Sequence, residues 1–134
     1  MATNVGILTT QWAPRMLSIL RIVSALIFMA HGTQKILGFP ASAMRPELLS
    51  LSGIAGLLEL VGGALLLVGL FSRPVAFLLS GEMAVAYFIA HAPKSPFPAL
   101  NGGDAAILFC FVFLYLAAAG AGPWSLDAGR RGRF

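Results

Sequence analysis

Three ionisable side chains interrupt long apolar stretches of the sequence: Arg21, Glu59 and Glu82. In a membrane-spanning helix each such group costs about 2.5–3.5 kcal/mol on insertion scales, so it usually faces protein or water and often marks a functional site. A planar guanidinium can bind a carboxylate through two parallel hydrogen bonds, which offsets part of the cost of burial. We therefore predict that Arg21 pairs with Glu59 and that Glu82, at a similar depth, belongs to the same polar network.

Histidines and lysines gather near one end of these stretches, where His31 and Lys35 precede one loop and His91 and Lys94 begin another. Two histidines and an acid are able to bind a metal, to hydrogen-bond a quinone carbonyl or to relay protons. Their spacing is sparser than that of metal sites, so we predict no metal. No residue is assigned a catalytic role. The candidate residues of a ligand-binding site or buried polar network are Arg21, His31, Lys35, Glu59, Glu82 and His91.

Structural interpretations of the same residues stay open beside the functional one. A salt-bridge network of Arg21, Glu59 and Glu82 could fix the helix register without doing chemistry. The two histidines could form hydrogen bonds at the membrane interface, and Lys35 could extend its ammonium group to water.

Helical spacing assigns these residues to particular faces. Steps of three and four residues put Arg21 and His31 on one face of the first apolar stretch. In the second stretch, the glycines three residues before and four residues after Glu59 would let a neighbouring backbone approach closely. Glu82 and His91 fall on different faces of the third stretch, so we do not expect them to share a pocket.

Four apolar stretches must position these groups, and roughly 20 residues suffice to cross a bilayer core about 30 Å thick. Hydrophobic residues make up 58% of the chain and charged residues 10%, which is the composition of a membrane protein. We predict an all-α fold, in which residues 1–134 form a single domain, an integral-membrane up-down four-helix bundle. The expected spans are residues 16–37, 48–70, 74–91 and 105–122.

Basic residues are distributed unevenly between the two sides of such a bundle. An even number of spans puts both termini on one side, and the positive-inside bias makes that side cytoplasmic. The net charge of +4 is scattered over the span ends, which argues against nucleic-acid binding. The terminal side carries Arg15, Arg73, Arg130, Arg131 and Arg133, whereas the opposite side carries Lys35, Arg45 and Lys94.

The sequence contains no centre that could carry electrons. Its single cysteine, Cys110, lies in an apolar run and excludes both an intramolecular disulfide and a cysteine-based metal site. There is no CxxC pair, haem motif or dinucleotide-binding loop. We therefore expect no intrinsic cofactor.

Three segments together resemble the DoxX family of membrane proteins: RIVSALIFMAHGTQKILGF, LLELVGGALLLVGLFSRPVAFLLSGEMAVAYFIAH and NGGDAAILFCFVFLYLAAAGAGPWSLD. The resemblance covers about residues 16–127. One departure is Asp104, where many relatives have a glutamate after NGG, so the side chain here has a shorter reach. The positions that carry the family pattern are Arg21, His31, Gly32, Lys35, Glu59, Gly62, Gly63, Gly69, Leu70, Arg73, His91, Asn101, Gly102, Gly103, Ser125, Leu126 and Asp127.

The resemblance implies a multi-pass protein of the bacterial inner membrane. Some DoxX-like proteins are associated with thiosulfate:quinone oxidoreductase, and others with complexes that couple thiol or sulfur redox to radical detoxification. We accordingly expect the membrane subunit of a quinone-linked thiol/sulfur or oxidative-stress oxidoreductase, which binds lipid and a quinone and leaves the redox centre to a partner protein. A proton-coupled small-solute carrier, which would need to form a homo-oligomer, and a membrane anchor or assembly protein are the alternatives.

Overall fold

The computed structural model describes residues 4–41 and 49–130, which contain helices and no strand. The predicted all-α fold is therefore confirmed for this part of the chain. Three of the arginines from which the membrane orientation was predicted lie outside the described residues: Arg45, Arg131 and Arg133. The helices are α1 (Asn4–Ile7), the π-helical turn η1 (Leu8–Trp12), α2 (Ala13–Leu37), α3 (Leu51–Val68), α4 (Ser72–Ala86), the π-helical turn η2 (Tyr87–His91), α5 (Pro98–Asn101), α6 (Asp104–Ala119) and α7 (Leu126–Arg130).

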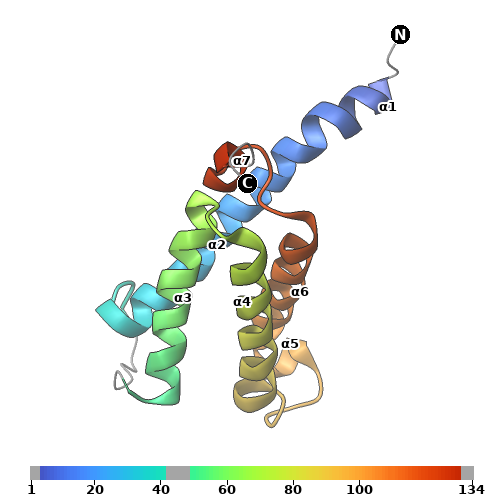
Figure 1. Ribbon diagram of the computed structural model, residues 1–134. Helices are drawn as coiled ribbons and strands as arrows, with labels where there is room; N and C mark the ends of the chain where they lie inside the picture. Colours follow the sequence, from blue (N-terminus) through green and yellow to red (C-terminus); the bar gives the residue numbers. More distant parts are fainter. Residues whose placement is uncertain (1–3, 42–48, 131–134) are drawn as a thin grey trace.

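Three helical stretches of the described chain are long and apolar enough to cross a membrane: Asn4–Leu37, Leu51–Val68 and Ser72–His91. The first begins well before the predicted residue 16, because α1, η1 and α2 follow one another without a break and residues 4–12 contain no charged side chain. The helix therefore projects beyond the rest of the molecule (Figure 1). The fourth predicted span corresponds to α6, which has only 16 residues.

The helices associate as two pairs, with α2 packed mainly on α3 and α4 packed mainly on α6. A short turn joins α3 to α4, and the axes of these two helices diverge away from it (Figure 1). We name the end with this turn and α7 the closed end, and the end with α5 the open end. A four-helix bundle remains a prediction, since pairing and a short α6 do not establish it.

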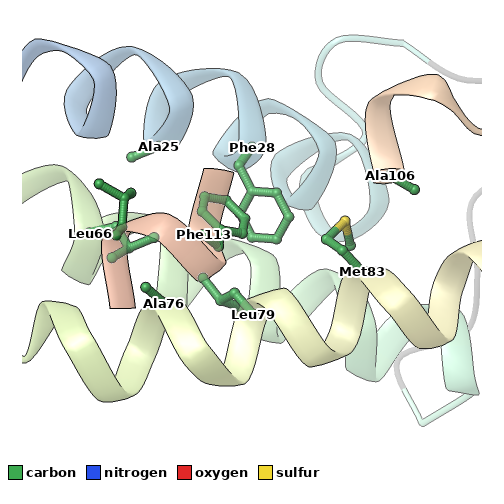
Figure 2. Packing of buried hydrophobic residues seen from close by; sticks show 9 residues of the cluster. Ala25, Phe28, Leu66, Ala76, Leu79, Met83, Ala106 and Phe113 are labelled. Atoms are coloured by element: carbon green, nitrogen blue, oxygen red, sulfur yellow. The ribbon is translucent and has the colours of Figure 1, made fainter. Parts of the chain in front are cut away.

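One hydrophobic core joins the two pairs (Figure 2). Phe28 of α2 packs edge-on against Phe113 of α6, with ring centroids 4.8 Å apart. Leu66 of α3 and Leu79 of α4 are also buried. Many other large apolar side chains face outward, as expected of helices that are surrounded by lipid. The remaining members of the core are Ala25, Ala76, Met83, Ala106 and Leu116.

At the closed end, Arg21 is 1% exposed and binds three backbone carbonyls. Its Nε donates to Leu66 O at 2.8 Å and its Nη2 to Trp124 O at 2.6 Å, and Nη1 donates to Ala121 O. These oxygens belong to the end of α3 and to the segment after α6. One side chain thus connects α2 to both.

Asp127 fastens the C-terminal segment to the turn between α3 and α4. Its carboxylate accepts hydrogen bonds from Phe71 N at 2.9 Å and Ser72 N at 2.8 Å, which caps the start of α4. Its own amide donates to Gly69 O at 2.8 Å. Gly69 has a left-handed backbone (φ 71°), and a Cβ there would lie 2.4 Å from Ser125 Cβ. Only glycine fits this contact.

Asp127 should make stability depend on pH. Burial opposes its ionisation, but the hydrogen bonds from Ser72 and Phe71 and the charge of Arg130 outweigh burial and hold the pKa of Asp127 below its ordinary value. A carboxyl with a lowered pKa stabilises the fold above its unfolded pKa, about 3.9, and loses this contribution as the pH falls through the folded value. We expect Asp127→Asn to cost about 1 kcal/mol at pH 7 and progressively less below pH 4. Thermal unfolding of the detergent-solubilised variant between pH 7 and 2 tests this, and a constant difference would contradict it.

Candidate functional site

The α2–α3 interface is built on glycines that bring the two backbones into contact. A Cβ at Gly32 would lie 2.7 Å from Leu60 N and 3.0 Å from Gly56 O. A Cβ at Gly56 would lie 2.9 Å from Lys35 Cβ. This close approach places Lys35 beside the segment of α3 that carries Glu59.

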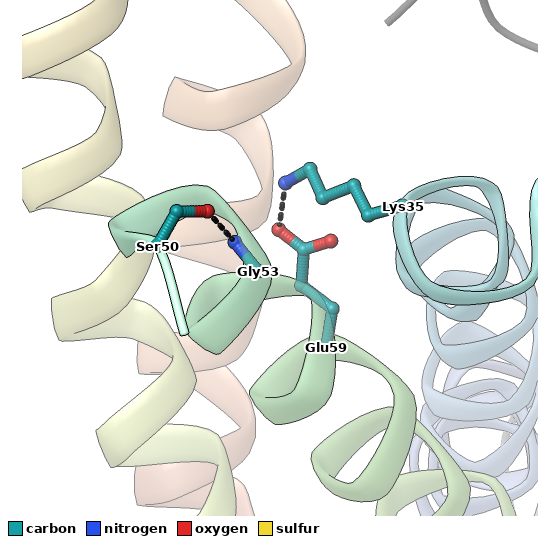
Figure 3. Close-up of polar contacts among 4 residues, drawn as sticks. All are labelled: Lys35, Ser50, Gly53 and Glu59. Atoms are coloured by element: carbon teal, nitrogen blue, oxygen red, sulfur yellow. Dashed lines mark hydrogen bonds and ion pairs between the residues drawn. The ribbon is translucent and has the colours of Figure 1, made fainter. Parts of the chain in front are cut away.

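Lys35 and Glu59 form an ion pair, with 2.7 Å between Nζ and Oε1 (Figure 3). The carboxylate is the buried partner, since the side chain of Glu59 is 3% exposed and that of Lys35 is 31% exposed. The second oxygen of Glu59 has no hydrogen-bond partner among the described residues. Glu59 lies at the middle of α3, about two turns after the N-terminal end of the helix, where the hydroxyl of Ser50 accepts a hydrogen bond from Gly53 N at 3.1 Å.

The predicted pair between Arg21 and Glu59 is wrong. Arg21 points to the closed end, where it donates to Leu66 O and to two carbonyls beyond α6. Glu59 precedes Leu66 by two helical turns, roughly 10 Å along α3 at 1.5 Å per residue. Lys35 stands at the level of the acid and takes its place.

Gly32→Ala should separate α2 from α3. The new methyl group would meet backbone atoms of Leu60, Gly56 and Glu59, which cannot rotate away as a side chain can. We expect a loss of about 1–3 kcal/mol, because overpacking forces the backbones apart. Thermal unfolding of the purified variant measures the loss. Gly81→Ala is the matched control, since nothing lies within 4 Å of a Cβ there; equal losses in the two variants would contradict the account.

A cavity of about 400 Å³ opens between the two helix pairs toward the open end. It brings together four of the residues predicted from the sequence, His31, Lys35, Glu59 and His91, and it leaves Arg21 out. The other lining residues are apolar or small: Phe28, Ser52, Met83, Ala86, Ala90, Gly102, Ala105, Ala106 and Phe109. The site therefore combines apolar walls with a few polar groups, as small-molecule sites commonly do.

The ring of His91 is oriented by the loop that precedes α6. Its Nδ1 lies 3.0 Å from the backbone carbonyl oxygen of Asn101. A carbonyl can only accept, so Nδ1 carries the hydrogen and, in the uncharged ring, Nε2 has the free lone pair. The other histidine of the cavity, His31 of α2, contacts the ring of Phe109 edge-on, with centroids 6.0 Å apart.

Asn101 holds this loop in place, a role that the residue pattern alone did not assign. It is 3% exposed, and its amide donates to Tyr87 Oη at 3.1 Å and to Ser95 O at 2.9 Å. Its side-chain oxygen accepts a hydrogen bond from Gly103 N at 2.8 Å. The NGG motif was the sequence signal that could have identified this loop. Its last glycine is required by the packing, because a Cβ at Gly103 would lie 2.6 Å from the Tyr87 ring.

Glu82 lines a second cavity, of about 260 Å³, between α3 and α4. Both of its carboxyl oxygens are buried, with no hydrogen-bond partner among the residues that the structure describes. Glu82 lies within electrostatic range of Glu59 and Lys35. As expected from their helical faces, Glu82 and His91 line different cavities. The two cavities adjoin, since both are lined by Lys35, Ser52, Ala86 and Ala90.

Within residues 4–41 and 49–130, no three histidine, cysteine or acidic side chains are grouped so that they could hold a metal. The polar groups of the cavity are suited instead to hydrogen bonding, with an ammonium donor, a carboxylate acceptor and two imidazoles. Its aromatic walls favour a flat ring.

Comparison with known proteins agrees with the resemblance noted in the sequence. The sequence model of the DoxX family matches residues 16–92. An uncharacterized protein of Haemophilus influenzae is 44% identical over 127 residues, which cover 87% of this chain and 92% of that protein. No solved structure matches the chain.

Proposed function

Because the chain belongs to the DoxX family, we propose that it is the membrane subunit of a quinone-linked thiol/sulfur or oxidative-stress oxidoreductase. In this proposal the cavity at the open end binds the head group of a quinone. A partner protein supplies the redox centre, since the sequence contains no CxxC pair, haem motif or dinucleotide loop.

The observation that carries the proposal is the character of this one cavity. It has room for a substituted ring, about 400 Å³, and Phe28 and Phe109 form part of its wall. Lys35 reaches it from α2 and His91 from η2, so hydrogen-bonding groups from separate elements converge on the same space. A quinone has this same combination of a flat apolar ring and two oxygen atoms.

The adjoining cavity suits the aliphatic tail of such a ligand. Apart from Lys35, Ser52 and Glu82 its lining is aliphatic, with Leu51, Ile54, Ala55, Leu58, Val85, Ala86, Ile89 and Ala90. Leu51, Ile54, Val85 and Ile89 are exposed on the outer surface of α3, α4 and η2, where lipid would surround them. A prenyl chain could thus extend from the head-group cavity into the bilayer.

The placement in the membrane is part of the proposal. We place α2, α3, α4 and α6 across the bacterial inner membrane as four spans, with both termini in the cytoplasm. Arg15 in the first turn of α2, Arg73 at the start of α4 and Arg130 in α7 then lie on the cytoplasmic side with the closed end. The cavity opens toward the opposite face, and a second copy of the chain or the redox partner would cover part of the remaining surface.

Quinone content of the purified protein tests the proposal. We expect wild-type protein purified with its native lipid to contain quinone in near-stoichiometric amount, measured by solvent extraction and chromatography. Ala105→Phe should reduce that amount roughly tenfold, because the new ring occupies the cavity that Ala105 lines. Ala118→Phe is the control, since this exposed alanine of the same helix lines neither cavity. Wild-type protein without quinone, or equal amounts in the two variants, would contradict the proposal.

A proton-coupled small-solute carrier is the second candidate, and Glu82 is the observation that favours it. A carboxyl with both oxygens buried and unpartnered among the described residues is a group that could bind and release a proton within the membrane. In that case uptake of solute into proteoliposomes should follow an imposed pH gradient and be lost in Glu82→Gln. Uptake that is indifferent to the gradient and to this substitution would remove the second candidate.

A further inference from the structure

The hydrogen-bonding groups of the cavity distinguish between the two redox forms of a quinone. A quinone presents two carbonyl oxygens, which only accept hydrogen bonds, whereas a hydroquinone presents two hydroxyl groups, which both donate and accept. The preferred form therefore depends on whether the protein offers donors or acceptors.

His91 offers an acceptor. Its Nδ1–H is used by the carbonyl oxygen of Asn101 at 3.0 Å, so the uncharged ring has only the Nε2 lone pair left for a ligand. The side chain of Asn101 is itself held by three hydrogen bonds, since its amide donates to Tyr87 and Ser95 and its oxygen accepts from Gly103 N, so the backbone carbonyl cannot easily turn away. A hydroxyl group can donate to that lone pair, but a quinone carbonyl would face it with a lone pair of its own.

Glu59 offers further acceptor sites on the same cavity. An ionised carboxylate has about four lone-pair positions and no hydrogen to donate. Glu59 lines the cavity, Lys35 uses one of the positions on Oε1, and Oε2 is buried without a partner within the described part of the chain. Glu59 is 2% exposed, so water does not compete freely for these positions. A carbonyl oxygen next to this carboxylate would leave them unsatisfied, at a cost typical of buried polar groups.

The ion pair as a whole matches a hydroxyl group. Lys35 has two further N–H donors beside the one that binds Glu59. A hydroxyl oxygen could accept from the ammonium group while its hydrogen is donated to the carboxylate. A carbonyl can use only the first of these two contacts. The remaining polar side chains, His31 and Ser52, can each present either a donor or an acceptor and do not discriminate.

We infer that the cavity binds the hydroquinone form, a ring with hydrogen-donating hydroxyl groups, in preference to the quinone. The inference rests on the proposed function and makes it more specific. It concerns binding alone: the ligand keeps its atoms and electrons, and His91 and Glu59 act as positioning residues that accept its hydrogen bonds.

Binding of three related compounds to the purified protein in lipid nanodiscs tests the inference. The compounds are decylubiquinol, decylubiquinone and the dimethyl ether of decylubiquinol, which keeps the ring and tail but has no hydrogen to donate. Equilibrium dialysis under anaerobic conditions measures each affinity. We expect decylubiquinol to bind roughly tenfold more tightly than both other compounds, because each leaves buried acceptors unpaired.

Variants of the protein test the same inference with the ligand's tail and ring unchanged, because only the acceptor groups of the cavity are altered. Glu59→Gln replaces acceptor positions with an amide donor, so the preference for decylubiquinol over decylubiquinone should fall at least several-fold. His91→Phe should reduce it also, and serves where Glu59→Gln does not fold. Asp104→Asn is the matched acid-to-amide control, since this exposed residue lines neither cavity; its preference should equal that of the wild type.

The outcomes separate the inference from the proposed function. Decylubiquinone binding as tightly as decylubiquinol, or more tightly, would overturn the inference and leave quinone binding intact. Equal binding of decylubiquinol and its dimethyl ether would overturn it in the same way. If none of the three compounds binds, the inference and the proposed function fail together.

Discussion

Arg21→Met should destabilise the protein more than any other single substitution considered above, by about 3 kcal/mol or more. The buried guanidinium donates to Leu66 O, Ala121 O and Trp124 O, and methionine can replace none of these hydrogen bonds. Leaving a buried acceptor unpaired costs about 1–3 kcal/mol, and this substitution removes the donors of three acceptors at once. Thermal unfolding of the detergent-solubilised variant, followed by circular dichroism, measures the loss.

Two further variants identify the cause. Arg15→Met removes an arginine of the same helix that lies over the ring of Trp12, 5.1 Å from its centroid, and should cost less than 1 kcal/mol. Arg21→Lys keeps the charge but offers a single ammonium group to three diverging carbonyls, so it should recover only part of the stability. Full recovery in Arg21→Lys would show that the charge, and not the three hydrogen bonds, holds the closed end together.

Lys35→Met is expected to have the second largest effect, a loss of about 3 kcal/mol in stability together with loss of quinone binding. It leaves the carboxylate of Glu59 buried without its counter-ion. The reverse change, Glu59→Leu, should cost about 1 kcal/mol, because Lys35 is 31% exposed and can turn its ammonium group toward water. Unfolding in denaturant and quinone extraction measure the two effects on the same preparations.

The double variant Lys35→Met with Glu59→Leu separates structure from function. Replacing both partners of a buried ion pair with apolar residues is often neutral for stability. We therefore expect near wild-type stability and roughly tenfold less bound quinone. A double variant that is stable and still binds quinone like the wild type would show that the ion pair is structural only.

The helices were predictable because lipid imposes a simple pattern on the sequence. Observed α3 (51–68) and α6 (104–119) fall close to the predicted spans 48–70 and 105–122. The face of α3 around Glu59 was also correctly identified as a surface for close backbone approach, because the glycines that permit it can be read directly from the sequence. The start of the first helix at Asn4 was missed, since residues 4–12 are less apolar than the rest and include Gly6, although they contain no proline.

The partners of the buried charges were harder to predict. Charge alone suggested that Arg21 would bind Glu59, but its partners are backbone carbonyls, which every residue has and no sequence pattern marks. Lys35 satisfies Glu59 because of the exact register between α2 and α3, which Gly32 sets through a backbone contact. His31 and His91 could be identified as candidates, but only the fold shows that they line one cavity with this pair.

The central claim, that a quinone head group occupies the cavity at the open end, is tested most directly by photoaffinity labelling with an azido-quinone. After illumination of the protein in nanodiscs, peptide mass spectrometry locates the labelled residues. The account predicts labels on the residues that line the cavity, such as Met83, Ala105 and Phe109, and their suppression by excess decylubiquinol. Labels confined to outward-facing residues such as Val23 or Phe111, and unaffected by the competitor, would contradict it.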